Sequence, residues 1–390
     1  MFKIQTLNKI ANCGLDLLTE DKYEVSTEVT NPDAILVRSA NMLEMELPGN
    51  LKAIARAGAG VNNIPIDKCS EKGIVVFNTP GANSNGVKEL VIASLLLSSR
   101  KITKGIEWAQ TLKGKGEEVA KLVEKGKSQF EGPEIKNKKI GVIGLGAIGV
   151  MVANDALSLG MEVMGYDPYI SVKAAWGLSS SVIRATSLDH LLSTCDYITL
   201  HMPLSSETKH MFNKEKFDVM KKGIRIINLA RGGLVSNKDL LEAIDAGIVS
   251  CYVTDFPEDE LLGVEEIIAI PHLGASTPES EENCAVMAVN QMKAYLETGM
   301  IRNSINFPDC DMLPTDKTRI ITVHCNIPSM IGQMTTILAA NKINISDMLT
   351  RHKDGIGYNV IDIEGDLTDD VIEKIRSIDG VKTVRVVTPD

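Results

Sequence analysis

Three polar residues that could carry acid–base chemistry lie in the second half of the chain. Arg231 and His272 each follow an apolar run closely, and Glu260 lies five residues past Asp255, which itself follows an apolar run. An imidazole can take or return a proton near neutral pH, and a guanidinium can hold a carboxylate and polarise a carbonyl. A carboxylate beside the imidazole would orient it and favour its protonated form. The set therefore suits proton transfer at a carbon that alternates between alcohol and carbonyl.

Each of these residues also has a structural alternative. Arg231 lies in a glycine-containing turn and could be a surface residue, and His272 could be a buried histidine with satisfied hydrogen bonds. Glu260 has several acidic neighbours and could be one more solvated carboxylate. The functional interpretation therefore depends on the elements that position the three side chains.

The stretch from 138 to 167 predicts the main positioning element, a strand, turn, helix and strand in succession. An apolar run at 140–143 precedes Gly144, Gly146 and Gly149, which have the G-x-G-x-x-G spacing. Gly144 allows the tight turn, Gly146 lets the backbone approach a pyrophosphate, and Gly149 lets the helix pack closely on the strand. The helix N-terminus would offer free N–H groups to phosphates. The alternative is a structural turn that binds nothing.

Asp167 ends the second strand of this unit, 18 residues past Gly149. An acid at this place can accept hydrogen bonds from both ribose hydroxyls, and it would repel a 2′-phosphate. The stretch therefore predicts an NAD site rather than an NADP site.

The N-terminal hundred residues predict a second α/β domain without a dinucleotide turn. Apolar runs at 34–37, 51–55 and 74–77 read as buried parallel strands. Arg38 and Arg56 follow two of them, at the sheet edge where ligands bind. We expect these arginines and the backbone of the next loop to hold an anionic substrate, with a surface ion pair as the alternative for each arginine. The loop residues are Gly58, Ala59, Gly60 and Val61.

Composition limits the classes of partner. The 390 residues carry a net charge of −10, which argues against nucleic acid and anionic membranes as partners. The N-terminus lacks the apolar region of a signal peptide, and no apolar run approaches a membrane span. The seven cysteines show no C-x-x-C spacing, so we expect reduced thiols, a cytoplasmic protein and no metal site.

Three further segments complete the predicted organisation. Residues 86–112 predict one long helix, and the lysine-rich 113–130 either a phosphate-binding patch or a solvated helical face. Residues 276–300 have helical period and could return the chain to the first domain. Beyond a proline-containing linker, the C-terminal stretch has the order βαββαβ, the ferredoxin-like unit.

The combined motifs resemble those of the D-isomer-specific 2-hydroxyacid dehydrogenases over nearly the whole chain. The matching stretches are Arg56–Asn62, Asn78–Pro80, Gly144–Gly149, His201–Leu204, Asn228–Gly233 and Pro271–Ser276. The resemblance assigns the catalytic roles to Arg231, Glu260 and His272. One departure is the segment after Asp255, where Phe256-Pro257 replaces an aliphatic residue and phenylalanine.

The resemblance implies an α/β fold with two doubly wound parallel sheets and a ferredoxin-like domain. It implies a discontinuous substrate domain at 1–98 and 276–305, an NAD-binding domain at 99–275, a linker at 306–317 and a regulatory domain at 318–390. The implied NAD contacts are Gly144, Gly146, Ala147, Ile148, Gly149, Asp167, Met202, Pro203, Leu229 and Asp255.

The implied activity is oxidation of D-3-phosphoglycerate to 3-phosphohydroxypyruvate, the first step of serine biosynthesis, in a homodimer or homotetramer. The substrate phosphate would meet Arg38 and Arg56. Alternatives are a hydroxypyruvate or glyoxylate reductase on the same scaffold, an NAD-sensing partner protein without activity, and a regulator that chiefly binds amino acids.

The C-terminal module resembles an ACT domain, a sensor of small molecules. The resemblance implies that L-serine is bound by His324, Asn326 and Asn344. The usual glycine after the first strand is Ser329 here, which could alter the turn that faces the effector. The alternative is a dimerisation module that senses nothing.

Overall fold

The computed structural model describes residues 1–388 and divides into two compact units. The first comprises residues 1–83 and 281–390, and the second comprises residues 84–280. Within the described residues, no helix is both long and apolar enough to cross a membrane.

The second unit is built on one parallel sheet with the strand order β12-β11-β10-β9-β6-β7-β8. This is the doubly wound order, in which the direction of winding reverses between β6 and β9. The strands are β6 (Lys139–Ile143), β7 (Glu162–Tyr166), β8 (Ile183–Arg184), β9 (Tyr197–Leu200), β10 (Ile224–Asn228), β11 (Val249–Thr254) and β12 (Ile267–Ala269). The predicted parallel sheet is confirmed, and the glycine turn follows β6 at the reversal point.

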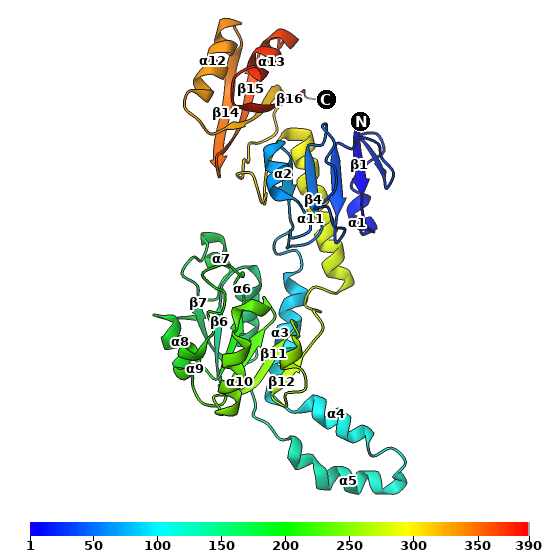
Figure 1. Cartoon of the computed structure of the whole chain (residues 1–390), viewed down its shortest axis with the longest axis vertical. Coiled ribbons are helices and arrows are strands. Elements are labelled where there is room, and N and C mark those ends of the chain that lie inside the picture. The colour runs from blue at the N-terminus through cyan, green and yellow to red at the C-terminus, as the bar shows by residue number, and fades with distance from the viewer. Residues whose placement is uncertain (389–390) are drawn as a thin grey trace. The chain divides into compact units, whose positions relative to one another are not determined.

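Helices lie against this sheet (Figure 1). Their apolar residues pack with those of the strands in two buried clusters. Gly141 allows the approach of helix α8, because a Cβ there would lie 2.2 Å from a methyl of Leu191. The helices of the unit are α3 (Ser84–Ser99), α4 (Ile102–Gln110), α5 (Val119–Gly126), α6 (Ala147–Ser158), α7 (Val172–Gly177), α8 (Leu188–Thr194), α9 (Lys214–Asp218) and α10 (Asn237–Asp245).

The expected single helix at 86–112 is wrong, because α3 ends at Ser99 and α4 begins at Ile102. The hydroxyls of Ser98 and Ser99 both donate to the Leu95 carbonyl, and such back-bonding bends or ends helices. The 113–130 segment is helical and exposed: neither α5 nor the two short 3₁₀ turns that flank it contain a buried residue. This fits the solvated helical face.

The first unit contains a second parallel sheet with the order β2-β1-β3-β4-β5. Its core includes Ile4, Leu36 and Phe77, against which the long helix α11 (Pro278–Thr298) packs. The other elements are β1 (Phe2–Thr6), β2 (Tyr23–Ser26), β3 (Ala34–Val37), β4 (Ala53–Arg56), β5 (Val75–Phe77), α1 (Asn12–Leu15) and α2 (Ile66–Glu71).

The units divide at Asn83/Ser84 and Ser280/Glu281, which differs from the expected divisions near 98 and 275. The reason is that α3 packs its Val87, Val91 and Leu95 into the core of the second unit's parallel sheet. The helix therefore belongs to the second unit, although its sequence adjoins the first.

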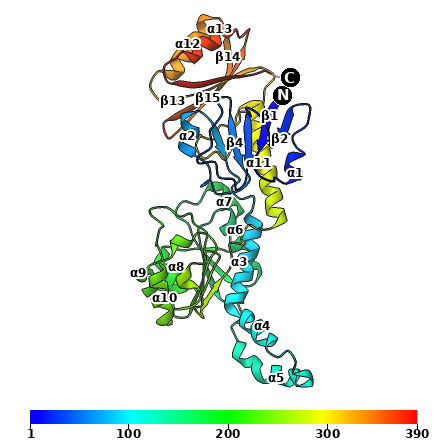
Figure 2. The same cartoon turned by 45° about the vertical axis from the view of Figure 1, so that its right-hand side comes forward.

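The C-terminal module has the predicted βαββαβ order and the sheet order β14-β15-β13-β16. All its strand pairs are antiparallel, as in the ferredoxin-like unit. The two helices lie on one face of the sheet (Figure 2). The elements are β13 (Thr318–Cys325), α12 (Met330–Ala340), β14 (Asn344–Lys353), β15 (Ile356–Glu364), α13 (Asp369–Arg376) and β16 (Val381–Val387).

The opposite face of this sheet shares a core with the first parallel sheet. Ile321, Val323 and Tyr358 of the module belong to the same buried cluster as Phe77 and Tyr295. The expected linker is also part of this packing, since Asn306, Phe307 and Cys310 are buried. The module is therefore not attached by a free tether.

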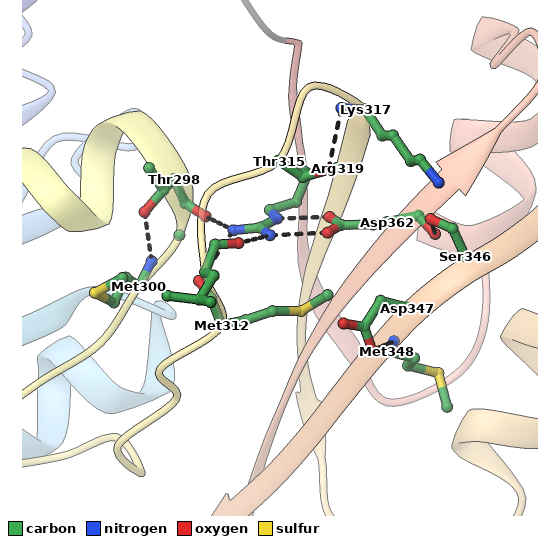
Figure 3. A network of polar contacts seen from close by, with 12 residues as sticks. Thr298, Met300, Met312, Thr315, Lys317, Arg319, Ser346, Asp347, Met348 and Asp362 are labelled. Carbon is green, nitrogen blue, oxygen red and sulfur yellow. Dashed lines mark hydrogen bonds and ion pairs between the residues drawn. The ribbon is translucent and has the colours of Figure 1, made fainter.

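A buried ion pair fixes the linker to the module (Figure 3). The guanidinium of Arg319 donates to both carboxylate oxygens of Asp362, at 2.6 and 2.9 Å. It also donates to the carbonyls of Thr298 and Leu313, at 2.9 and 2.6 Å. The Arg319 side chain thus donates hydrogen bonds to the carbonyl at the end of α11, to a carbonyl of the linker and to the carboxylate of Asp362 on β15.

Candidate active site

The turn after β6 requires glycine at two positions. Gly144 has φ +90°, and a Cβ there would lie 2.7 Å from the carbonyl oxygen of His201. A Cβ on Gly149 would lie 1.9 Å from the carbonyl oxygen of Gly144. Both glycines therefore permit the close approach of strand, turn and helix that the sequence predicts.

Gly146 has a different role, because a Cβ there would meet nothing within 4 Å. Gly146 is the N-cap of α6, and because it has no side chain it cannot cap the N–H groups of the first helical turn. The first-turn N–H groups, including those of Ala147 and Ile148, have no intrahelical acceptor, as in any helix. An open cradle beside free N–H groups fits a pyrophosphate.

Asp167 closes this cradle at the end of β7. Its Oδ2 accepts from the Leu145 N–H at 2.8 Å, and its Oδ1 accepts from the Tyr169 N–H at 2.8 Å. Each carboxylate oxygen keeps a second lone pair, so the residue can still accept from ribose hydroxyls. The residues present fit a dinucleotide of the NAD type.

The segment after β9 is held against the same turn. The His201 N–H donates to the Ile143 carbonyl at 2.8 Å, and its Nε2 lies 2.9 Å from Thr199 Oγ1. Desolvation lowers the pKa of His201 to about 3, so the ring is neutral. Met202 and Pro203 follow at the same edge, and Leu229, just past β10, is buried in the neighbouring core.

Asp255 follows β11 and is 1% exposed. Its Oδ1 has no hydrogen-bond partner in the described part of the chain. Burial raises the pKa of this carboxyl, and the charges of His272 and Arg231 oppose that shift. A buried acceptor without a partner, near the Arg231 and His272 side chains, marks this as the polar centre of the sheet edge.

His272 and Arg231 are exposed at that edge. The His272 ring packs against the Phe256 ring at a tilt of 49°, with 4.8 Å between centroids, and the His272 backbone N–H donates to the Asp255 carbonyl at 3.1 Å. The buried Asn228 side chain fixes the Arg231 loop by donating to the Arg231 carbonyl at 2.9 Å and accepting from Ala230 N–H at 3.2 Å. Hydrogen bonds therefore fix the backbone at both His272 and Arg231.

The structure does not pair Glu260 with His272. Within residues 1–388, no ion pair of 4.0 Å or less joins them; Glu260 instead accepts from Asn237 Nδ2 at 2.7 Å. The same amide donates to Glu258 at 2.8 Å. Asn237 was not anticipated, since a lone asparagine at a helix start carries no sequence signal of this role.

The predicted substrate residues lie in the other unit, at the ends of β3 and β4. Arg38 pairs with Glu281 at 2.6 Å, and both side chains are more than 40% exposed. Arg56 donates to the Arg38 carbonyl at 2.9 Å and to the Gly60 carbonyl. A Cβ on Gly58 or Gly60 would lie 3.1 Å from Arg56 Nη1. Arg56 therefore organises the loop that contains Ala59 and Val61.

Two of the three predicted effector residues share a pocket in the C-terminal module. His324 and Asn326 line a pocket of about 210 Å³. Asn344 does not line it, and its amide donates to Glu364 at 3.0 Å. It lies at the opposite end of β14 from the pocket residues Thr350–His352, about 20 Å along the strand.

Comparisons with known proteins match this geometry. Residues 92–274 match the model of the D-isomer specific 2-hydroxyacid dehydrogenase NAD binding domain. The chain is 35% identical to the hydroxypyruvate reductase of Thermotoga maritima, across 72% of this chain and 89% of that protein. It is 32% identical to the D-3-phosphoglycerate dehydrogenase of Methanocaldococcus jannaschii, across 84% of this chain and 61% of that protein.

The curated phosphoglycerate dehydrogenases first matched are longer, and the chain spans between 55% and 64% of their length. Among solved structures, NAD⁺-bound 3-phosphoglycerate dehydrogenase of Entamoeba histolytica superposes with a TM-score of 0.61 at 26% identity. That alignment covers 78% of this chain and 98% of that one. The predicted cofactor, NAD, is confirmed by the matched NAD-binding domain, and the chain belongs to the D-isomer-specific 2-hydroxyacid dehydrogenases.

Proposed function

We propose that the chain oxidises D-3-phosphoglycerate to 3-phosphohydroxypyruvate, the first step of serine biosynthesis. The observation that carries the reaction class is the sheet edge where His272 and Arg231 lie near Asp255, a buried carboxyl whose Oδ1 has no partner among the described residues. The resemblance to named phosphoglycerate dehydrogenases over most of the chain supports the choice of substrate.

Bound NAD⁺ would accept the hydride from C2 of the substrate. The residues of this chain supply the rest: Arg231 holds the substrate carboxylate through its paired N–H donors, and His272 takes the proton from the C2 hydroxyl. The exposed His272 ring packs against the side chain of Phe256. We assign to Glu260 the role of orienting the protonated imidazole. For this role Glu260 has to give up its hydrogen bond from Asn237 and turn towards His272.

The substrate phosphate is assigned to Arg38, whose partner Glu281 forms only an exposed ion pair that an anion can displace. The backbone N–H groups of 58–61, in the loop that Arg56 organises, would hold a carboxylate. The proposal includes a homo-oligomer, which the exposed apolar side chains of Ile102 and Ile106 on α4 support. It also includes a cytoplasmic location.

The C-terminal module is proposed to be an ACT domain that binds L-serine, with His324 and Asn326 in its pocket. Asn344 remains a proposed contributor although it lies outside that pocket.

A second candidate is a hydroxypyruvate reductase, favoured by the Thermotoga maritima relative that the chain covers almost completely. NADH formation or consumption at 340 nm separates the two. D-3-phosphoglycerate should give a kcat/KM at least about tenfold above that of D-glycerate. Equal values for the two acids would favour the second candidate.

A further inference from the structure

Two residues that follow β5 hold the loop at 58–61 by its carbonyl groups. The Thr79 N–H donates to the Gly58 carbonyl at 3.1 Å, and Asn78 Nδ2 donates to the Ala59 carbonyl at 2.6 Å. Both residues are buried, since Asn78 is 9% exposed and Thr79 is 0% exposed. The two carbonyls therefore face the protein and are held from one short segment.

The third carbonyl of the loop also has a donor from the protein. The guanidinium of Arg56 donates to the Gly60 carbonyl. A peptide unit is planar and trans, so its C=O and its N–H point in opposite directions. Hydrogen bonds to the carbonyls of residues 58, 59 and 60 therefore turn the N–H groups of residues 59, 60 and 61 away from these donors.

The outward N–H groups of this loop have no acceptor. Within residues 1–388, the N–H groups of Ala59, Gly60 and Val61 donate to no protein atom. The Gly58 N–H, by contrast, donates to the Arg56 carbonyl at 2.9 Å. Successive free N–H groups form a concave surface that binds anions. Each of the three free donors has its direction set by a hydrogen bond on the other side of its own peptide unit.

A buried glutamine on α11 fixes the segment that holds the loop. Gln291 is 8% exposed, and its Nε2 donates to the Asn78 carbonyl at 2.9 Å. The Asn78 carbonyl and the Thr79 N–H belong to one peptide unit, which is therefore hydrogen-bonded on both sides. Gln291 Oε1 accepts from Asn303 Nδ2 at 2.6 Å, so both ends of the glutamine amide are fixed. Hydrogen bonds in such a chain strengthen one another.

We propose that Asn78 and Gln291 are positioning residues for substrate binding, because they direct the free N–H groups of the 58–61 loop towards one carboxylate. Neither side chain needs to touch the substrate, since both act through the peptide units that they hold. The proposal rests on the carboxylate role proposed above for this loop and deepens it. It also separates the loop from Arg38, which is assigned to the phosphate.

Steady-state kinetics on the full chain test the assignment. Asn78→Asp replaces the amide donor by a carboxylate that repels the Ala59 carbonyl, and it should raise KM for D-3-phosphoglycerate about tenfold or more. Gln291→Met removes both amide hydrogen bonds at similar side-chain volume and should raise this KM about threefold or more. In both variants kcat and KM for NAD⁺ should stay within about twofold of wild type, because the glycine turn belongs to the other unit.

The choice of substrate gives a second readout. D-3-phosphoglycerate and D-glycerate share the carboxylate, so KM for both acids should rise by the same factor in each variant. Lys293→Met is the matched control, because Lys293 lies on the same helix and donates to the Leu17 carbonyl at 2.6 Å rather than to the segment at 78–79. Its KM values should stay within about twofold of wild type.

Four results would overturn the proposal: a wild-type KM for both acids in either variant, a rise confined to D-3-phosphoglycerate, an equal rise in KM for NAD⁺, or an equal rise in Lys293→Met. A wild-type chain that turns over neither acid would instead contradict the proposed function. Hydrogen exchange at the Thr79 amide then decides, because Gln291→Met should speed it at least about threefold and Lys293→Met should not. Exchange at the wild-type rate in Gln291→Met would also overturn the proposal.

Discussion

Each of the two parallel sheets has a glycine-containing loop at the carboxyl end of one strand, after β6 in the second unit and after β4 in the first. The glycines of the two loops have opposite roles. After β6, Gly146 leaves open space beside free N–H groups. After β4, the space beside Gly58 and Gly60 is filled by the guanidinium of Arg56, which donates to the Gly60 carbonyl. The first loop is thus shaped for a ligand, and the second is shaped by the protein's own arginine.

This difference shows that a glycine pattern alone does not identify a binding loop. Absence of a side chain can admit a ligand or can admit a neighbouring residue, and only the contacts distinguish the two. In the second unit the acceptor at Asp255 is also unpartnered, whereas in the first unit Arg38 and Arg56 both have partners.

The largest effect is expected at the cofactor sheet. His272→Ala should lower kcat by about 10³-fold, because the hydroxyl proton then has no positioned acceptor. NADH affinity, measured by fluorescence, should stay within about threefold of wild type, since the His272 ring packs against Phe256 and its removal does not alter the glycine turn. A variant that keeps a tenth of wild-type turnover would remove His272 from the proton-transfer role.

A matched pair of glycine substitutions tests the contrast directly. Gly146→Ala should weaken NADH binding by about tenfold or more without changing the melting temperature, because its Cβ meets no protein atom. Gly60→Ala should lower the melting temperature and leave NADH binding unchanged, since its Cβ would lie 3.1 Å from Arg56 Nη1. Calorimetry and NADH titration measure both; the same profile for the two variants would contradict the distinction.

The two arginines of the first unit should also separate. Arg38→Ala should raise KM for D-3-phosphoglycerate by about tenfold and leave stability almost unchanged, because it loses only an exposed ion pair. Arg56→Ala should lower the free energy of unfolding by about 1–3 kcal/mol, because carbonyls of Arg38 and Gly60 lose their donor. Urea titration and steady-state kinetics give the two readouts. An equal rise in KM for D-glycerate would assign Arg38 to the carboxylate instead.

The smallest effect concerns the charge on Asp255. Its pKa is raised in the folded chain, mainly by burial, so the charged form destabilises the fold above the unfolded pKa near 3.8. Asp255→Asn should therefore raise the melting temperature by about 2 °C at pH 7, and the gain should vanish as the pH falls below that value. Thermal unfolding across this pH range checks the sign; a loss of stability at neutral pH would show that the carboxylate is stabilising.

The sequence predicted elements where a local pattern and the tertiary packing agree. The run Val381–Val387 is a strand with these bounds, and the glycine turn follows β6 as expected. The break after Ser99 was missed, because it depends on two serine hydroxyls that donate to the Leu95 carbonyl of the preceding turn rather than to solvent. The unit boundary was missed because the apolar face of α3 does not reveal which sheet it packs on.

Among the candidate site residues, those on strand ends could be placed from sequence, and those on loops could not. Glu260 lies in an acidic loop, and its contact with Asn237 has no local signature. Asn359 did carry a signal, since it interrupts the buried strand β15 with a polar side chain, but its hydrogen bond to Thr322 depends on the register of β13 on β15.

The core shared by the C-terminal sheet and the first parallel sheet limits how this chain can be shortened. Ending it before β13 would remove Ile321, Val323 and Tyr358 and would leave Tyr295 and Phe307 facing water. It would also remove Arg319, which caps the end of α11. The C-terminal module and the first parallel sheet are therefore expected to unfold together, and a fragment that ends before β13 would need polar replacements on the uncovered face to stay in solution.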